Sequence, residues 1–392
     1  MDQSQVSPPF ADRRTAVLVV AMANSVHTAR WLQQFKDRPY DVTLIPSTAS
    51  RSIHPQILEL RNEDTELTLS IPRFFQVVAF PVGILDLALS QRLMALIIRI
   101  WIKLSRRRFD VVHAMELQHA GYTLLASGLA KSISRVVVSN WGSDIYWFRR
   151  FPRHRRRLTR LLRLSTHYSC ECTRDVEIAR NLGFAGTVLP VVPNAGPISE
   201  IGLAGGIAAP KTSSRKLVLV KGYTGFVGRA DIALSAIRNC RAELDGFEVV
   251  VYSSDRKSRS IAKKISKEYS VNIRTLKKYE MSHNQMLELF QAARVYLGIS
   301  ESDGISTSLL EALASGAFPI QSDTSCADEW IEDGLNGSIV PWNDVDKITE
   351  RLRRSLLDDV FVDSAAEINL GISKKRLSAG AFKGVYDSVY EL

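Results

Sequence analysis

Two carboxylates bracket the start of an expected helix in residues 300–320. Asp303 lies in the loop before the helix, and Glu311 lies about one to two turns inside it. The loop glycine lets a ligand approach the backbone closely, and the free N–H groups at a helix start attract anions. An apolar leucine stripe on the same helix faces a core, so both acids can border one cleft. The backbone N–H groups expected to hold a phosphate belong to Gly304, Ile305, Ser306 and Thr307.

Strand-like segments lie on both sides of this motif. Residues 294–299 come before it, and the apolar segment 318–320 follows a Ser-Gly turn. Such a loop lies at the carboxyl end of a parallel strand, where open α/β sheets bind their ligands.

The motif resembles the donor site of retaining GT-B glycosyltransferases of the GT4 family, the glycosyl transferases group 1, of the bacterial surface-polysaccharide type. The resemblance rests on an acid at Asp303, seven residues, Glu311 and the sequence Ala-Leu-Ala-Ser-Gly-Ala-Phe-Pro-Ile. The family usually has Glu as the first acid, and the nearby Glu301 does not have the required spacing to Glu311. The resemblance implies that Glu311 binds ribose hydroxyls, that Asp303 binds a sugar hydroxyl, and that the loop N–H groups hold the diphosphate.

A glycine-rich segment follows the first expected strand of the second half. Its glycines, Gly222, Gly225 and Gly228, permit tight turns, and Lys221 and Arg229 bring positive charge to a helix start. The segment is neither GxGxxG nor a Walker A loop, which argues against NAD and ATP. By the family resemblance, Arg229 and Lys221 hold the phosphates of the donor and offset the charge of the leaving diphosphate, so that no metal is needed.

The string Asp344-Val345-Asp346 is similar to a DxD metal motif. It precedes a helical segment, and an acidic first turn suits the helix dipole. We therefore interpret it as a helix cap, and no cofactor or metal is expected.

The first half offers four candidates on the other side of a cleft. Asp144 ends a strand in a Gly turn and resembles the Asp of a family His-Gly-x-Asp segment, with Trp141 in place of the His. Asp144 can orient a sugar or acceptor hydroxyl, or cap the next helix, and the sequence leaves both open. His27 follows the first strand in a loop that resembles the acceptor-side loop of the family. His113 and Glu116 end another strand, and a lone His is more often structural than catalytic.

The chain is long enough, at 392 residues, to bury two cores, and its strands and helices alternate in both halves. Residues 195–214 are rich in Pro, Gly, Ala and Ser, which is typical of a linker. We predict an α/β chain of the GT-B class, with two Rossmann-like doubly wound domains facing each other across a cleft. The expected parts are residues 1–194 for the acceptor domain, 215–370 for the nucleotide-sugar donor domain, and 371–392 for a C-terminal helix that packs back on the first domain.

The charge distribution and the cysteine content indicate where in the cell the protein is expected to work. All of the excess positive charge lies before residue 201, where 26 Lys and Arg residues face 16 Asp and Glu residues. Residues 91–108 combine an apolar face with basic residues, as a peripheral membrane helix or a core helix with a solvated basic end would. No nucleic-acid-binding motif accompanies the charge. The N-terminus has no apolar signal region, and no apolar run reaches roughly 18 residues. The four cysteines have no CxxC spacing, so we expect neither a disulfide framework nor a zinc site.

These observations together predict a cytoplasmic, hexosyltransferase-like enzyme, at the inner face of a membrane, that moves a sugar from a UDP-sugar to a lipid-linked or polysaccharide acceptor. Two alternatives share the architecture. A nucleotide-sugar 2-epimerase would need no acceptor, and a non-catalytic binding module would keep the cleft without turnover.

Overall fold

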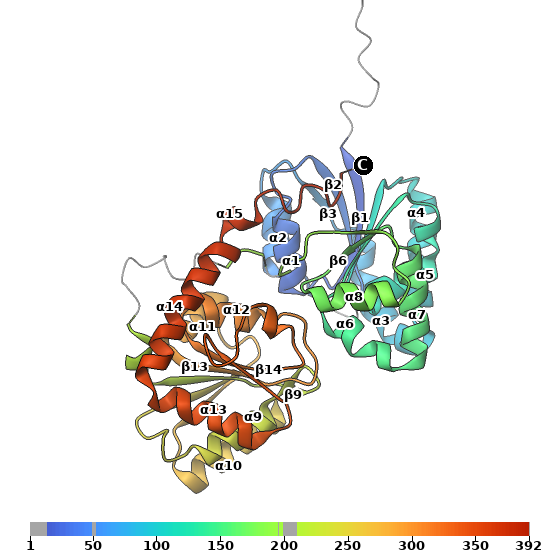
Figure 1. The fold of residues 1–392 in the computed structure, drawn as a ribbon. Helices are drawn as coiled ribbons and strands as arrows, with labels where there is room; N and C mark the ends of the chain where they lie inside the picture. The colour runs from blue at the N-terminus through green and yellow to red at the C-terminus, as the bar shows by residue number, and fades with distance from the viewer. Residues whose placement is uncertain (1–13, 49–51, 195, 199–209, 392) are drawn as a thin grey trace, which may run out of the picture.

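The protein contains two parallel sheets, one in each half of the chain (Figure 1). The computed structural model describes residues 14–48, 52–194, 196–198 and 210–391. The strand order is β3-β2-β1-β4-β5-β6-β7 in the first sheet and β12-β11-β8-β13-β14-β15 in the second. Helices cover both faces of each sheet. The predicted fold class, two doubly wound Rossmann-like domains in a GT-B arrangement, is confirmed. Most of the predicted linker, residues 195–214, lies outside the described residues.

The first domain contains the first seven strands and eight α-helices of the described chain. Its central strands are apolar on both faces because helices cover both sides of the sheet, and Val17 to Val20 of β1 are 0–1% exposed. The strands are β1 Thr15–Ala21, β2 Tyr40–Pro46, β3 Thr68–Ser70, β4 Val111–Met115, β5 Arg135–Ser139, β6 His167–Ser169 and β7 Thr187–Val188. The helices are α1 Val26–Gln33, α2 Pro55–Asn62, α3 Arg73–Leu89, α4 Arg92–Ser105, α5 His119–Ser127, α6 Ser143–Tyr146, α7 Pro152–Leu164 and α8 Thr173–Asn181.

The second domain repeats the alternation. Its strands are β8 Leu217–Lys221, β11 Glu248–Ser254, β12 Ile273–Lys277, β13 Ala293–Gly298, β14 Phe318–Ser322 and β15 Ser338–Val340, and β9 Thr224–Gly225 and β10 Gly228–Arg229 form a separate antiparallel hairpin. Its helices are α9 Ala230–Asn239, α10 Arg256–Tyr269, α11 His283–Ala292, α12 Thr307–Ala314 and α13 Val345–Leu357. The hairpin occupies the segment where the sequence predicted a glycine-rich turn leading directly into a helix.

The strand order of each sheet reverses beside its first strand. The reversal lies between β1 and β4 in the first sheet and between β8 and β13 in the second. Such a switch point opens a crevice at the carboxyl ends of the two strands, because their connections leave in opposite directions. The loops after these four strands are therefore the places where ligand-binding side chains are expected.

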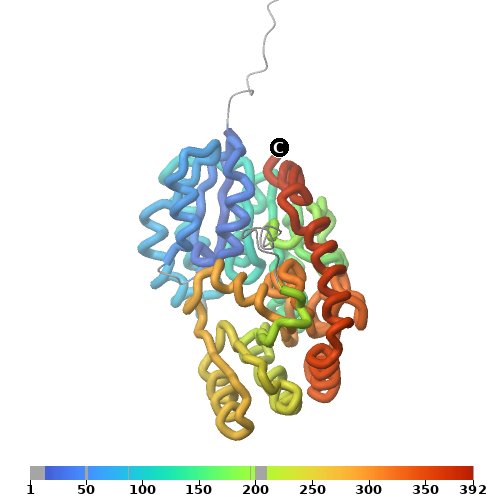
Figure 2. Tube along the Cα trace, turned by 90° about the vertical axis from the view of Figure 1, so that its left-hand side faces the viewer, coloured from blue at the N-terminus to red at the C-terminus, as the bar shows by residue number. Residues whose placement is uncertain are grey.

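The last part of the chain returns to the first domain. Helix α14, Asp359–Arg376, and the short α15, Ala379–Phe382, run from the second domain to the first and are red in Figures 1 and 2. Tyr390 then stacks on Phe35 with ring centroids 4.6 Å apart and accepts a hydrogen bond from Trp31 Nε1 at 3.2 Å. The hydroxyl of Tyr390 also lies 2.7 Å from Nδ1 of His113, which is fully buried. His113 is therefore part of the aromatic core that joins the C-terminal segment to the first domain.

Candidate active site

An ion pair between a buried lysine and a partly buried carboxylate lies at the switch point of the second sheet. Lys221, the last residue of β8, donates from Nζ to Oδ2 of Asp303 at 2.8 Å. Lys221 is 8% exposed. Burial lowers its pKa, but the Asp303 carboxylate and nearby tyrosine hydroxyls outweigh burial, so that the pKa of Lys221 is raised. The structure thus brings together the lysine and the first acid of the two sequence motifs.

The three glycines of the second-domain motif serve different purposes. A Cβ at Gly222 would lie 2.3 Å from the Tyr252 carbonyl oxygen, which accepts the Gly222 N–H at 2.9 Å. A Cβ at Gly228 would lie 2.6 Å from that of Tyr223. Packing therefore excludes a side chain at both positions. Nothing lies within 4 Å of a Cβ at Gly225, so this glycine is not required by packing and faces open space.

Arg229 lies in the same glycine-rich segment as Lys221, but its partners are other acids and an aromatic ring. Its guanidinium donates to Asp231 from Nε at 2.9 Å, contacts Glu301 through Nη1, and lies 4.8 Å from the ring centroid of Trp342. Hydrogen bonding to Asp231 is the largest cause of the raised pKa of Arg229. Glu301, the acid with the unsuitable spacing in the sequence, is thus a partner of Arg229, while Asp303 is the partner of Lys221.

The start of α12 has free hydrogen-bonding capacity. Ser306 is its N-cap residue, but the Ser306 side chain accepts no hydrogen bond from the first turn, which begins at Thr307. Ile305 is 3% exposed and anchors the preceding loop in the core. The first N–H groups of a helix have no partner within the helix, so this turn is suited to an anion next to Lys221.

The two domains touch beside this helix start. A Cβ at Gly304 would lie 2.9 Å from the Gly142 Cα, and a Cβ at Gly142 would lie 2.1 Å from the Gly304 nitrogen. Gly142 also has a φ of +83°, which L-residues with side chains rarely adopt. Only glycines allow this approach of the two loops.

Glu311 lies in the second turn of α12 and faces the first domain. It is 6% exposed, with Arg30 Nη2 at 3.9 Å and His283 Nδ1 at 3.8 Å. Burial raises the pKa of Glu311 to about 7, and Arg30 offsets part of this effect. Arg30 belongs to α1, so the first domain supplies a cation beside the second acid of the donor motif.

On the first-domain side, Asp144 connects two loops. Its carboxylate oxygens accept the Leu117 N–H and the Trp141 N–H, both at 2.9 Å, and burial raises its pKa to about 7. The Trp141 ring lies 5.3 Å from the His27 ring. Burial, and then Arg30, lower the pKa of His27 to about 4, and its buried Nδ1 has no partner among the described residues. His27 is therefore a neutral imidazole with one nitrogen available.

Two further acids are buried near the domain boundary: Glu116, which the sequence analysis named at a strand end, and Glu171, which carried no sequence signal. Glu116 accepts hydrogen bonds from the N–H groups of Gln118 and His119, each at 3.0 Å. Glu171 accepts the Asn194 N–H at 2.9 Å, and burial raises its pKa well above the usual range. Only the folded chain brings Glu171 to the domain boundary, where its Oε2 lies 3.1 Å from a Cβ built on Gly304.

A cleft of about 1100 Å³ lies between the domains and is lined mainly by the first domain. Asp303, Asp144 and Glu116 line it, whereas Lys221 and Glu311 are not part of its lining. The first domain contributes Trp141, Ser143 and Asp144 to its lining, and the second contributes Phe226, Val227 and Asp303. At its edge the Phe226 ring stacks on Trp147, with centroids 5.1 Å apart and planes 5° from parallel. The cleft therefore has walls from both domains and a carboxylate on each side.

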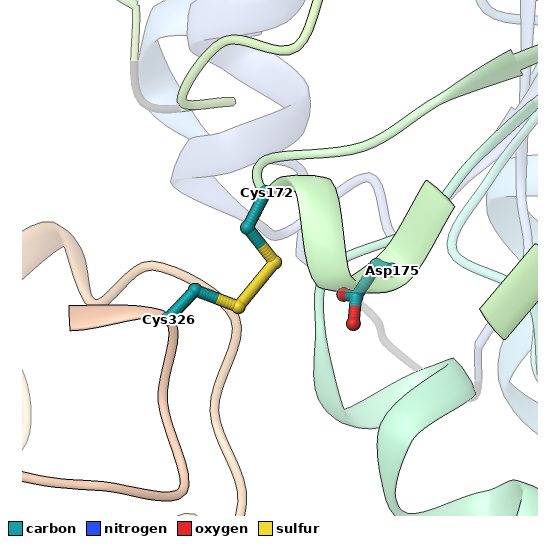
Figure 3. Close-up of side chains that lie close together, drawn as sticks. All are labelled: Cys172, Asp175 and Cys326. Carbon is teal, nitrogen blue, oxygen red and sulfur yellow. A yellow bond between two sulfur atoms is a disulfide. The ribbon is translucent and has the colours of Figure 1, made fainter. Parts of the chain in front are cut away.

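A disulfide joins the domains next to the cleft (Figure 3). It links Cys172, just before α8, to Cys326, after β14, with Cα atoms 6.2 Å apart. The expectation of no disulfide is wrong for this pair, because partners 154 residues apart on different domains leave no spacing signal. The nearby Asp175 carboxylate accepts a hydrogen bond from Asn140 at 2.6 Å and pairs with Arg174 at 2.9 Å.

Two family models match the chain, one in each domain. Residues 209–369 match the glycosyl transferases group 1, and residues 16–167 match the glycosyl transferase 4-like family. Both descriptions agree with the group 1 and GT4 resemblance of the donor motif. No curated protein matches the sequence.

Solved structures of low sequence identity share the fold over nearly the whole chain. The α,α-trehalose 6-phosphate synthase from Burkholderia multivorans has a TM-score of 0.69 at 12% identity, with 96% of this chain and 98% of that chain covered. The Anabaena protein HepE, in complex with UDP-glucose, has a TM-score of 0.66 at 11% identity, with 97% and 100% covered. Sucrose-phosphate synthase from Thermosynechococcus elongatus has a TM-score of 0.63 at 12% identity, with 95% and 96% covered.

Proposed function

Because the chain is a glycosyltransferase of the group 1 type with the GT-B fold, we propose that it transfers a sugar from a UDP-sugar to an acceptor hydroxyl with retention of configuration. The choice of uridine is supported by HepE, whose structures contain UDP-glucose or UDP. Another structure with this fold is that of a UDP-forming trehalose-phosphate synthase from Burkholderia xenovorans.

The observation that carries this proposal is the Lys221–Asp303 pair at the switch point, beside the uncapped start of α12. In the proposed complex, Lys221 and the N–H groups of the helix start hold the diphosphate, and Glu311 accepts hydrogen bonds from the ribose. Asp303 accepts one from a sugar hydroxyl. Fixed positive groups of this kind stabilise the charge that develops on the leaving diphosphate.

In the proposed reaction the acceptor hydroxyl attacks the face of the sugar from which the diphosphate leaves. The departing phosphate oxygen takes the acceptor proton, so the protein needs no separate base. Its contribution is to position both substrates and stabilise charge. In this proposal, Asp144, which lines the cleft, and His27, whose ring lies 5.3 Å from that of Trp141, contact the acceptor or the donor sugar.

We further propose that this chemistry needs no metal. Lys221 and the start of α12 supply positive charge at the expected position of the diphosphate. The Asp344 carboxylate accepts the Lys347 N–H at 2.9 Å at the start of α13, as a helix cap does. The expected result is that EDTA leaves activity unchanged, and restoration of lost activity by Mg²⁺ or Mn²⁺ would contradict the proposal.

The test of the donor assignment is binding and turnover of nucleotide-sugars. UDP-glucose, GDP-mannose and ADP-glucose are compared by thermal shift, since a ligand of the folded state raises the melting temperature. The bound donor is then incubated alone. We expect slow release of UDP together with free sugar. Glu311→Ala should lose this activity, and Glu367→Ala, which changes an exposed acid on α14, should keep it. An isomerised sugar would indicate an epimerase, and binding without turnover, even with acceptors, would indicate a binding module.

The proposal includes contact with an anionic membrane through helices α3 and α4. Val77 on α3 is 75% exposed and Leu104 on α4 is 78% exposed, and the basic side chains of Arg99 and Lys103 accompany them on α4. We call this surface the α3–α4 face. Its exposed large apolar side chains are Phe74, Val77, Ile84, Leu85, Leu89, Leu96, Ile100 and Leu104.

An apolar surface bordered by arginine and lysine fits a bilayer with anionic head groups. No helix within the described residues combines the length and apolar character that crossing a bilayer requires. Contact at the surface is thus the proposed mode, and the cytoplasmic leaflet, which carries anionic lipid, is the proposed location. The acceptor would then be a lipid-linked glycan of a cell-surface polysaccharide.

Sedimentation with vesicles of equimolar phosphatidylcholine and phosphatidylglycerol at low salt tests the membrane contact. The expected result is that the wild type sediments and the double variant Val77→Glu/Leu104→Glu does not. The matched control is Leu357→Glu/Val360→Glu, because these residues are 65% and 77% exposed in the second domain. A wild type that stays in solution would refute the contact. If the wild type is a dimer that Val77→Glu/Leu104→Glu dissociates and the control variant does not, while vesicle binding is unchanged, the α3–α4 face is a subunit interface.

A further inference from the structure

One helix of the first domain places a row of arginines along the cleft. Arg153, Arg156 and Arg160 of α7 line it, and Arg92 at the start of α4 lines it beside them. Spacings of three, four and seven residues put the α7 arginines on one side of the helix, while its buried leucines anchor the other side in the core. We call these four residues the arginine wall.

The arginine wall is held in place by a neighbouring residue. Arg157, also on α7, donates to the Ser90 carbonyl and to Oε1 of Gln91, both at 2.9 Å, and lies 3.8 Å from the ring centroid of Tyr122. Ser90 and Gln91 join α3 to α4. Arg157 is therefore committed to fixing the α3–α4 turn against α7, which holds Arg92 near the other arginines.

The arginine wall has no counter-charge of its own. The side chains of its four members form no hydrogen bond or ion pair with any of the described residues, and α7 contains no acidic residue. The cleft does contain carboxylates, but each has other partners. Glu116 and Asp144 accept backbone N–H groups, and Asp303 pairs with Lys221. Four neighbouring positive charges repel one another, and a bound anion would relieve this repulsion.

We propose that the arginine wall binds the phosphate or diphosphate of a lipid-linked acceptor. The proposal rests on the proposed transferase function and specifies its acceptor. Guanidinium groups bind phosphate oxygens through paired hydrogen bonds, and the cleft that holds the wall also contains Asp303. A phosphate on the wall thus places an attached acceptor hydroxyl in the same cleft as Asp303, the first acid of the donor motif.

The position of the wall favours a lipid phosphate over a free one. Ser90, Gln91 and Arg92 line the cleft, and they also form the turn at one end of the α3–α4 face. A chain attached to a phosphate on the wall can therefore continue along this apolar face into the bilayer. A soluble sugar phosphate would use the arginines but would leave the adjoining apolar surface without a role.

Calorimetric titration with three probes separates the two components of this site. Farnesyl diphosphate carries both a prenyl chain and phosphates, inorganic pyrophosphate carries only phosphates, and farnesol carries only the chain. The test variant is Arg153→Gln/Arg156→Gln/Arg160→Gln. The matched control, Arg238→Gln/Lys263→Gln/Lys267→Gln, removes three exposed charges from α9 and α10 in the second domain.

We expect farnesyl diphosphate to bind the wild type and the control more tightly than either single-component probe. The triple arginine variant should bind it at least roughly 10-fold more weakly, because charge-assisted hydrogen bonds to phosphate are lost. Unchanged binding to this variant would overturn the site. Binding of pyrophosphate as tight as that of farnesyl diphosphate would overturn the lipid assignment, and equally tight binding of farnesol would overturn the phosphate assignment.

The donor site provides an independent readout. UDP-glucose should bind the triple arginine variant as it binds the wild type, which also shows that the variant is folded. Lys221→Met should lose UDP-glucose binding and retain farnesyl diphosphate binding. Failure of the wild type to bind any nucleotide-sugar would refute the proposed function, whereas equal loss of both ligands in the triple variant would refute a separate acceptor site.

Discussion

Replacing Glu311 by Gln separates the cost of burying this carboxylate from its proposed role in donor binding. Burial raises its pKa from 4.5 to about 7, although Arg30 lies 3.9 Å away. Gln has nearly the shape of protonated Glu at every pH. The variant therefore keeps the contacts of the acid form and never carries the buried charge.

The sign and size of the effect follow from proton binding. Below about pH 4.5 both the folded and unfolded chains hold the proton, so burial of the charge costs nothing. As the pH rises from 4.5 to about 7, the unfolded chain loses its proton first, and the stability of the wild type falls. A tenfold change in acidity is worth about 1.4 kcal/mol, so the penalty is about 1 kcal/mol near pH 5 and about 3 kcal/mol near pH 8.

Urea denaturation near these two pH values measures the difference. Glu311→Gln should exceed the wild type in free energy of unfolding by about 3 kcal/mol near pH 8 and by about 1 kcal/mol near pH 5. The exposed Glu367→Gln on α14 is the control, and it should match the wild type at both. An advantage of the same size at both pH values, or none near pH 8, would refute the burial argument. The same variant should also lose UDP-glucose binding, because the ribose hydroxyls lose their charged acceptor.

Three further changes test the site. Lys221→Met should weaken UDP-glucose binding and lower the free energy of unfolding by about 3 kcal/mol, because it leaves a largely buried carboxylate unpaired; unchanged stability in urea would contradict the buried ion pair. Gly142→Ala should separate the domains, raise the radius of gyration in small-angle scattering and abolish transfer. Gly128→Ala is the control, because φ is +73° there but nothing lies within 4 Å of an added Cβ, so this variant should show only the effect of backbone strain. A reductant should lower the melting temperature of the wild type but not of Cys172→Ser, and a non-reducing peptide map without the Cys172–Cys326 link would contradict the disulfide.

The sheets could be predicted from the sequence because their strands are buried on both faces and appear as short β-branched runs between turn residues. The helical segment expected after Asp344 is α13, and it could be predicted because Asp344 caps it and an apolar stripe defines its buried side. Helix α3, the short β3 and the β9–β10 hairpin were missed. The α3 segment is apolar on nearly all sides, so it has no helical periodicity, and β3 contains only three residues.

The donor motif could be located from the sequence because its chemistry is local. Asp303 and Glu311 are separated by a loop and a single helix start, and a spacing rule captures that arrangement. The contacts that cross between domains could not be located in this way. The Arg30–Glu311 contact joins residues 281 positions apart, and the approach of Gly142 to Gly304 joins residues 162 positions apart. No periodicity within one segment encodes either contact.

The contacts between the domains also hold the loop that carries the Asp303 carboxylate. Arg174 of α8 donates to the Asp303 carbonyl at 2.9 Å and to the Thr324 carbonyl at 3.0 Å, so the first domain holds the loop that carries the Asp303 carboxylate. That carboxylate in turn neutralises Lys221. In the proposed donor complex the diphosphate adds a second anion beside Lys221, and the Asp303 side chain can then turn to a sugar hydroxyl without leaving the lysine unpaired. Contact between the domains and donor binding are therefore coupled in this scheme. A domain movement that displaces Arg174 also displaces the Asp303 carboxylate, which must turn from Lys221 to the sugar hydroxyl.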